Sequence, residues 1–142
     1  MPMSTTKEQF IADLNKALEW EYAAAVQYVQ HAATITGAQY AAIAKELVIH
    51  ANEEMAHAVL VATVINDLGG VPTIDVEKRE VSENSTTMLE QDLAGEELAI
   101  SIYKALVKNA DELGEYGIRQ TLEGILMQEE EHRRDIMTSL GK

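Results

Sequence analysis

Apolar residues recur at three- and four-residue intervals over most of the chain, which is the spacing of one face of an α-helix. Glycines interrupt this pattern at Gly37, at Gly69-Gly70 and at Gly114, and glycine often follows the last turn of a helix. The pattern predicts an all-α protein with four long helices. The expected helices cover about 5–36, 38–68, 87–113 and 115–140, with an irregular connection over 71–85.

Two of the helix starts carry a capping box, in which Ser or Thr is followed three residues later by Glu or Gln. Thr5 with Glu8 and Thr87 with Glu90 match this spacing. We therefore expect Thr5 to cap the first helix and the third helix to begin near Thr87.

The lengths of the connections predict the topology. Short turns at Gly37 and Gly114 make each helix pair antiparallel. The stretch 69–85 reaches about 56 Å when extended, whereas a return along the bundle needs only about 36 Å. The sequence therefore predicts an up-down-down-up four-helix bundle with one long crossover.

The inward-facing heptad positions of the two helix pairs repeat after 75 residues. Each of the four stripes contains one glutamate, and the second and fourth helices also contain histidine. Each stripe is followed here by its counterpart: Leu14, Leu18, Glu21, Ala25 and Tyr28 with Leu89, Leu93, Glu96, Ile100 and Tyr103; Leu47, His50, Glu54, His57 and Val61 with Leu122, Ile125, Glu129, His132 and Ile136. The repeat indicates two related helical hairpins, and it selects Glu96 rather than Glu97 as the counterpart of Glu21.

Within each hairpin the two inward glutamates are nearly equidistant from the turn, so an antiparallel pair places them at the same height. Four glutamates and two histidines are therefore expected to meet at one level: Glu21, Glu54, His57, Glu96, Glu129 and His132. Four ionised carboxylates cannot be buried without counter-charge. Two divalent cations would neutralise them, and carboxylate with imidazole suits iron or manganese. The i, i+3 spacing of each Glu-x-x-His directs both side chains at one ion.

Other polar residues near this level have simpler interpretations. His31 and His50 are interpreted as hydrogen-bonded core histidines, and Ile125 at the repeat position of His50 agrees with that, although a ligand role for His50 stays open. Tyr28 and Tyr103 are core aromatics whose hydroxyls need a partner, and a carboxylate of the centre is the nearest choice.

Composition narrows the class of protein. The chain has 142 residues, which we take as a single domain over 1–142, with a net charge of −13 from 24 acidic and 11 basic residues. Such an acidic balance disfavours nucleic acid and anionic membranes as partners. Neither a membrane-spanning run nor an apolar leader at the start is apparent, so we expect a cytoplasmic protein. The absence of cysteine excludes thiol catalysis and thiolate-held clusters.

The combined pattern resembles ferritin-like di-iron proteins, in which two helices give one Glu each and two give Glu-x-x-His. More closely it is similar to bacterioferritins over residues 8–138. The stretches that carry this resemblance are Leu14-Asn15-Lys16, Glu21, Gln27-Tyr28, Glu54-Met55-Ala56-His57, Asp92-Leu93-Ala94-Gly95-Glu96 and Glu129-Glu130-Glu131-His132. The resemblance implies that Glu21, Glu54 and His57 hold one iron, that Glu96, Glu129 and His132 hold the other, and that Glu54 and Glu129 bridge them.

The chain departs from bacterioferritins after the fourth helix. Only ten residues follow His132, so the short fifth helix that closes a twenty-four-subunit shell is missing. We therefore expect a dimer or a twelve-subunit shell. The DNA-protecting mini-ferritins usually build their site between subunits and often carry a basic tail, and rubrerythrins need a cysteine cluster; this sequence has neither the tail nor the cysteines.

The resemblance implies a ferroxidase that oxidises Fe²⁺ with O₂ or H₂O₂ to a bridged diferric product and stores or detoxifies iron. Two alternatives remain: a di-metal oxidase or manganese catalase-like enzyme with a permanent metal cofactor, and a non-catalytic metal-binding scaffold.

A second apolar stripe on the outer face of the second helix predicts a subunit interface. It comprises Val48, Ala51, Met55, Ala58, Val59 and Ala62. Bacterioferritins place a Met directly after the ligand Glu of this helix, where two symmetry-related sulfurs hold one haem iron. The resemblance therefore implies that Met55 binds haem; without haem, Met55 fills an interface gap.

Overall fold

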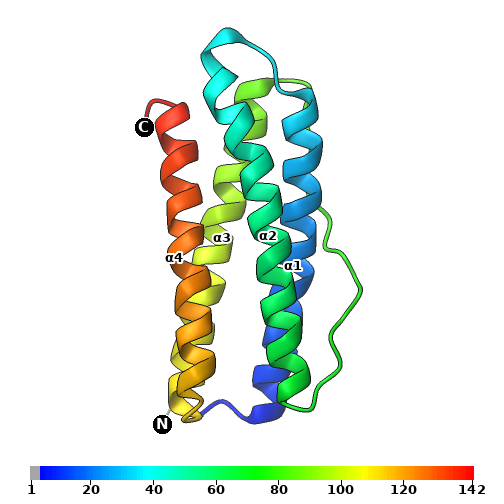
Figure 1. The fold of residues 1–142 in the computed structure, drawn as a ribbon, viewed down its shortest axis with the longest axis vertical. Coiled ribbons are helices and arrows are strands. Elements are labelled where there is room, and N and C mark those ends of the chain that lie inside the picture. The colour runs from blue at the N-terminus through cyan, green and yellow to red at the C-terminus, as the bar shows by residue number, and fades with distance from the viewer. Residues whose placement is uncertain (1–3) are drawn as a thin grey trace.

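The computed structural model describes residues 4–142 and shows an up-down-down-up bundle of four helices (Figure 1). Residues 1–3 of the predicted domain lie outside the described residues. The helices are α1 (Lys7–Thr34), α2 (Ala41–Asp67), α3 (Ser85–Glu112) and α4 (Tyr116–Ser139), and a 3₁₀ turn, Ala38–Tyr40, precedes α2. The all-α class and the topology predicted from the sequence are confirmed.

The two predicted helix starts are displaced by one residue at α1 and by two residues at α3. Thr6 rather than Thr5 caps α1, because its extended backbone lets its Oγ1 accept from the backbone N–H of Gln9 at 3.1 Å. Asn84 caps α3 in the same way by accepting from the N–H of Thr87 at 2.9 Å. Thr87 therefore lies inside the first turn of α3. Thr and Asn are both favourable N-cap residues. The capping-box spacing alone therefore could not distinguish Thr6 from Thr5, or Asn84 from Thr87.

The crossover between α2 and α3 runs along the outside of α1 (Figure 1). Asn15 fixes its start twice, by donating to the carbonyl of Val71 at 3.1 Å and by accepting from the N–H of Thr73 at 2.9 Å. Further along, the side chain of Gln27 donates to the carbonyl of Glu80 at 2.8 Å. These bonds satisfy backbone groups of a segment that has no secondary structure of its own.

Two apolar clusters fill the bundle on either side of a polar level. One cluster includes Phe10, Leu18 and Ile65, and the other includes Leu47 and Ile136. Burial of these side chains, at about 25 cal/mol per Å² of apolar surface, is the main stabilising contribution to the fold. The bundle is thus held from both ends around the level that carries the buried glutamates.

None of the helices over residues 4–142 is both long enough and sufficiently apolar to cross a membrane.

Candidate metal centre

All six residues expected to form the centre are buried at one level of the bundle. None is more than 3% exposed: Glu21 on α1, Glu54 and His57 on α2, Glu96 on α3, and Glu129 and His132 on α4. Each hairpin contributes three of them. The level lies between the two apolar clusters, so water is largely excluded from the carboxylates.

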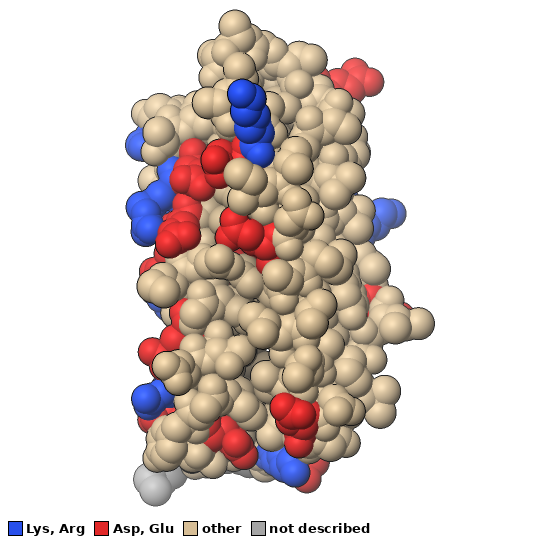
Figure 2. All heavy atoms as spheres, in the orientation of Figure 1, with Lys and Arg blue, Asp and Glu red and all other residues tan. Residues whose placement is uncertain are grey.

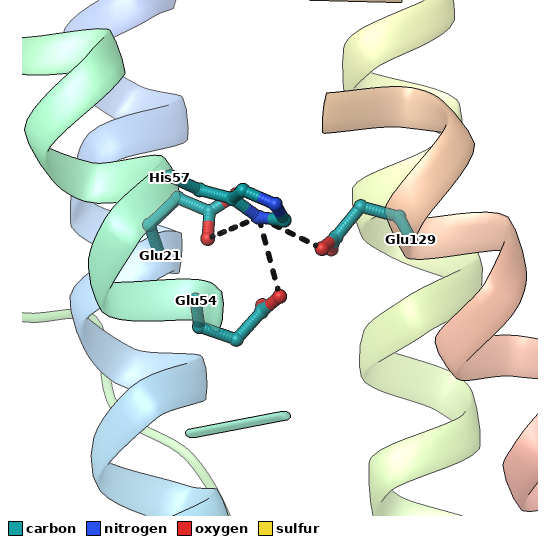
Figure 3. A group of neighbouring side chains, drawn as sticks. All are labelled: Glu21, Glu54, His57 and Glu129. Atoms are coloured by element: carbon teal, nitrogen blue, oxygen red, sulfur yellow. Dashed lines mark ion pairs between the residues drawn. The ribbon is translucent and has the colours of Figure 1, made fainter. Parts of the chain in front are cut away.

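One group of potential ligands surrounds Nδ1 of His57 (Figure 3). This nitrogen lies 3.1 Å from a carboxylate oxygen of Glu129, 3.4 Å from Glu54 and 3.6 Å from Glu21. The ligand atoms of these four residues all lie within 4.8 Å of one another. Glu129 reaches this group across the bundle from α4.

A second group surrounds Nδ1 of His132. It lies 3.2 Å from an oxygen of Glu54, 3.4 Å from Glu96 and 3.6 Å from Glu129. Their ligand atoms also lie within 4.8 Å of one another. Glu54 and Glu129 therefore belong to both groups, and two adjacent ions could share these two carboxylates.

The structure turns Glu96 into the bundle and its neighbour Glu97 towards the surface. Glu96 is 2% exposed, whereas the side chain of Glu97 is 57% exposed beside Arg133. The 75-residue repeat had selected Glu96 as the inward residue.

Two buried tyrosines donate hydrogen bonds to the centre. The hydroxyl of Tyr28 donates to Glu96 at 2.5 Å, and that of Tyr103 donates to Glu21 at 2.6 Å. Each tyrosine thus serves the glutamate of the opposite hairpin. Burial and the nearby carboxylates raise the pKa of both tyrosines well above its usual value, so the hydroxyls keep their protons and act as donors.

The sequence reasoning missed the residues that orient the two histidines. Nε2 of His57 hydrogen-bonds to the side-chain oxygen of Gln128, and Nε2 of His132 lies 3.5 Å from a carboxylate oxygen of Glu53. The hydrogen bond to Gln128 fixes the tautomer of His57 that leaves Nδ1 free for a metal. Nε2 of His132 has no hydrogen-bond partner among the described residues and meets Glu53 only as an ion pair. Glu53 and Gln128 are themselves 75 positions apart, so the repeat contained the signal that could have found them.

The electrostatics of the metal-free cluster favour bound protons. Burial, followed by the charges of Glu21 and Glu96, raises the pKa of Glu54 to about 8. Burial and the charges of the other glutamates also raise the pKa of Glu129 well above its usual range. Burial disfavours the charged form of His57, but its hydrogen bonds with Glu129, Glu21 and Glu54 outweigh that effect and raise its pKa. A divalent cation entering this level would displace these protons.

Comparison with known proteins decides the family. The family described as "Ferritin-like domain" matches residues 11–142. The chain belongs to this family.

Two curated relatives and three solved structures place this ferritin-like chain more closely. The bacterioferritin of Brucella melitensis is 33% identical, over 93% of this chain and 86% of that protein. A nutrient stress-induced DNA-binding protein of Synechococcus is 29% identical, over 90% of this chain and 78% of the relative. The prediction that nucleic acid is not a partner therefore stays a prediction.

The solved structures share the whole bundle. A ferritin-like di-iron carboxylate protein of Bacillus anthracis is 28% identical with a TM-score of 0.91, covering 97% of this chain and 99% of its own. A dodecameric thioferritin, the bacterioferritin-related protein of Bacteroides fragilis, is 30% identical with a TM-score of 0.90 over 97% and 88%. The bacterioferritin of Rhodobacter capsulatus is 28% identical with a TM-score of 0.86, covering 98% of this chain and 87% of its own. That structure has a metal-free dinuclear site and a haem iron in a crystallographic special position.

Two further histidines of this ferritin-like chain have carboxylate partners. His31 and Asp92 form a fully buried pair between α1 and α3, with Nδ1 and Oδ1 2.8 Å apart. His50 is 1% exposed and its Nε2 lies 3.1 Å from a carboxylate oxygen of Asp135. Both are thus hydrogen-bonded core histidines, as the sequence analysis interpreted them.

The crossover places an arginine over the centre from the α1/α3 side. The guanidinium of Arg79 lies 4.8 Å from the ring centre of Trp20 and packs so closely on Gly95 that a Cβ there would lie 2.2 Å from its Nη1. Arg79 also borders a small cavity lined by Glu21 and Glu54. A side chain at position 95 would therefore displace the Arg79 guanidinium, a contact that the sequence pattern did not reveal.

The outer apolar stripe predicted on α2 is narrower than expected. Ala51 and Ala58 are 7% and 2% exposed, because they flank the inward stripe and pack inside the bundle, so their assignment to the outer face was wrong. Val48, Met55 and Val59 remain about half exposed or more, at 52%, 47% and 63%.

Proposed function

We propose that this protein is a ferroxidase that binds Fe²⁺ at the six-residue centre and oxidises it with O₂ or H₂O₂. The observation that carries the proposal is the burial of four glutamates and two histidines at one level, in two overlapping groups. Unpaired carboxylate oxygens support the same conclusion. Among the described residues, at least one oxygen has no hydrogen-bond partner in each of Glu21, Glu54, Glu96 and Glu129. Unpaired buried acceptors of this kind are what a cation satisfies.

In this proposal each side chain has a definite role. Glu54 and Glu129 bridge the two ions, and Glu21 with His57 and Glu96 with His132 complete the two ends. Two Fe²⁺ give up two electrons and become Fe³⁺. These electrons and two protons reduce O₂ to H₂O₂, or H₂O₂ to two waters. Anionic ligands favour the ferric state because they stabilise the higher positive charge.

The tyrosines and the residues behind the histidines hold this arrangement in place. Tyr28 and Tyr103 donate to the terminal glutamates and fix their orientation. Gln128 holds the ring of His57 by a hydrogen bond, and the carboxylate of Glu53, 3.5 Å from Nε2 of His132, would hold that ring by its charge, so that Nδ1 of each ring faces the ions. Protons released from Glu54 and Glu129 when Fe²⁺ enters are available to the reduced oxidant.

Replacing Glu96 by Ala tests the proposal against its neighbour. The variant loses a terminal ligand of one ion, and the initial rate of Fe²⁺ oxidation, followed by ferric absorbance, should fall by at least about 100-fold. The matched control Glu97→Ala removes an exposed carboxylate one residue away and should oxidise iron at nearly the wild-type rate. Equal loss in both variants, or loss only in Glu97→Ala, contradicts the assignment.

Iron storage requires that the subunits assemble, and one face of the bundle favours association. Exposed apolar residues occur on the first hairpin at Val26, Val29, Val48, Met55 and Val59. Their counterparts 75 positions later are Ser101, Lys104, Glu123, Glu130 and Arg134. These five apolar side chains therefore have polar counterparts on the second hairpin, and they offer a patch that a two-fold contact between copies could bury.

The same face supports haem as a second ligand. The thioether of Met55 is exposed between Val48 and Val59, so two copies related by a two-fold axis would bring two sulfurs to one flat group. Haem bound there would supply one-electron transfer, which the chain's own side chains at that face do not. Protein expressed with ample haem precursor should show a Soret band that Met55→Ala removes while ferroxidase activity survives. A colourless wild-type protein would leave Met55 as interface packing.

A further inference from the structure

A third cluster of metal-binding side chains lies outside the dinuclear centre, on the side where α2 meets α4. Glu46 and His50 are one turn apart on α2, and Asp135 reaches them from α4. One ligand atom of each lies within 4.8 Å of the other two. Ligand atoms that share one ion at bonds of about 2.1 Å are roughly 3–4 Å apart, so a small closing movement suffices.

The three side chains differ in burial in a way that suits an entry site. His50 is 1% exposed, Glu46 is half-buried, and the side chain of Asp135 is 44% exposed. Nδ1 of His50 has no hydrogen-bond partner among residues 4–142, so this buried imidazole is only half satisfied by Asp135. Several acidic side chains lie in the upper half of this face, with Lys and Arg beside them (Figure 2). The acidic side chains nearest the cluster would attract cations.

The cluster adjoins the centre directly. The ring of His50 stacks on that of His132, with centroids 4.0 Å apart and planes at 24°. Glu53, which contacts His132 at 3.5 Å, is on the same side and half-buried. An ion at the outer cluster is therefore separated from the centre by one layer of side chains. On the α1/α3 side, by contrast, Arg79 places a positive charge next to the cavity that borders Glu21 and Glu54.

The internal repeat shows that the bundle does not need this cluster. The positions equivalent to Glu46, His50 and Asp135 in the other hairpin are Thr121, Ile125 and Leu60, which cannot form such a site. Ile125 is buried in the core without any polar partner. The packing role that His50 shares with Ile125 is thus met by an apolar residue, and the polar cluster is an addition on one side only.

We propose that Glu46, His50 and Asp135 bind a third divalent cation and that Fe²⁺ passes through this site on its way to the dinuclear centre. The binding part stands on the geometry of the cluster, and the transit part rests on the proposed ferroxidase function. One nitrogen and two carboxylates leave open coordination positions for water, as a site that must release its ion requires.

Counting ions tests the binding part. The wild-type protein should bind three Co²⁺ ions per chain in equilibrium dialysis. The dialysis is anaerobic, so that the Co²⁺ is not oxidised. Asp135→Asn and Glu46→Gln each remove one ligand and should weaken one of the three sites by at least about tenfold, as loss of metal partners does. The matched control Glu131→Gln removes an exposed carboxylate one turn away on α4 and should keep three. Two ions per wild-type chain, or three undiminished sites in Asp135→Asn, overturn the inference.

Kinetics test the transit part. At limiting Fe²⁺ the initial oxidation rate of Asp135→Asn should fall by about threefold or more, while its rate at saturating Fe²⁺ stays at the wild-type value. Unchanged rates at both concentrations overturn transit through this site. Glu96→Ala separates the two proposals, because it disables the dinuclear centre but should keep the outer Co²⁺ ion. A wild-type protein that binds the outer Co²⁺ but oxidises no iron contradicts the proposed function and leaves the third site intact.

Discussion

The two hairpins, α1–α2 and α3–α4, match in the layer of candidate metal ligands and differ at other buried polar positions. At their meeting level the glutamates, histidines and tyrosines match position by position at an offset of 75. Beyond it, His31 and Asp92 correspond to Leu106 and Ala17. The difference teaches that the requirements of two equivalent ions act on a single layer of side chains, whereas the other polar side chains of the core vary independently between the hairpins.

The largest expected effect is the pH dependence of stability that comes from the glutamates of the shared layer. The pKa of Glu54 rises from 4.5 to about 8 on folding, so the folded metal-free protein retains a proton that the unfolded chain releases. Its contribution to stability is complete below pH 4.5 and is lost as pH rises through about 8, at most roughly 5 kcal/mol. The raised pKa of His57 acts in the same direction above its ordinary 6.5.

Thermal melts of chelator-treated protein measure this effect. The melting temperature should be lower at pH 8 than at pH 5 by roughly 10 °C, and both Glu54→Gln and Glu129→Gln should flatten the dependence, because the pKa values of both residues are raised. If only one of the two variants flattens it, the two hairpins do not share the layer equally. Added Mn²⁺ should stabilise the protein more at pH 8, where it displaces fewer protons.

The next effect tests a region that the hairpins do not share. Asp92→Ala leaves the imidazole of His31, which is 0% exposed, without its partner. The free energy of unfolding in urea should fall by about 2–4 kcal/mol. The double variant His31→Leu with Asp92→Ala copies Leu106 and Ala17 from the other half and should recover at least half of the loss. A double variant less stable than Asp92→Ala would show that the two environments are not interchangeable.

The smallest expected effect concerns the residues next to Nε2 of the two histidines. The carboxylate of Glu53 lies beside His132, and the amide of Gln128, at the equivalent position, lies beside His57. Glu53→Gln makes the support of His132 resemble that of His57, and Mn²⁺ affinity at one of the two sites should fall by about tenfold. Gln128→Glu makes the reverse change and should strengthen the other site. Titration with Mn²⁺ separates the two affinities. Identical binding in wild type and both variants would mean that these contacts do not tune the ions.

The parts of the structure that the two hairpins share could be predicted from the sequence, and the parts that differ between them could not. The repeat predicted the fold and brought six distant residues to one level, because ligands of one centre must keep their register in both halves. It could not predict Arg79 over Trp20 or the pair of His31 with Asp92. The other hairpin does not repeat these residue types: Leu106, Ala17 and Gly95 stand at the positions equivalent to His31, Asp92 and Trp20. The contacts therefore depend on how the crossover and α3 pack against α1.

The crossover held along α1 has a consequence for how the chain captures metal at low protein concentration. Each hairpin carries three of the six ligands, so two separate hairpins would have to collide before both ions could be held. The tether makes this an intramolecular encounter with an effective concentration on the order of millimolar. Ion capture therefore does not depend on how much protein is present. A break in the backbone at Ile74, which is 89% exposed, would leave only the packing between the two hairpins to keep the six ligands together.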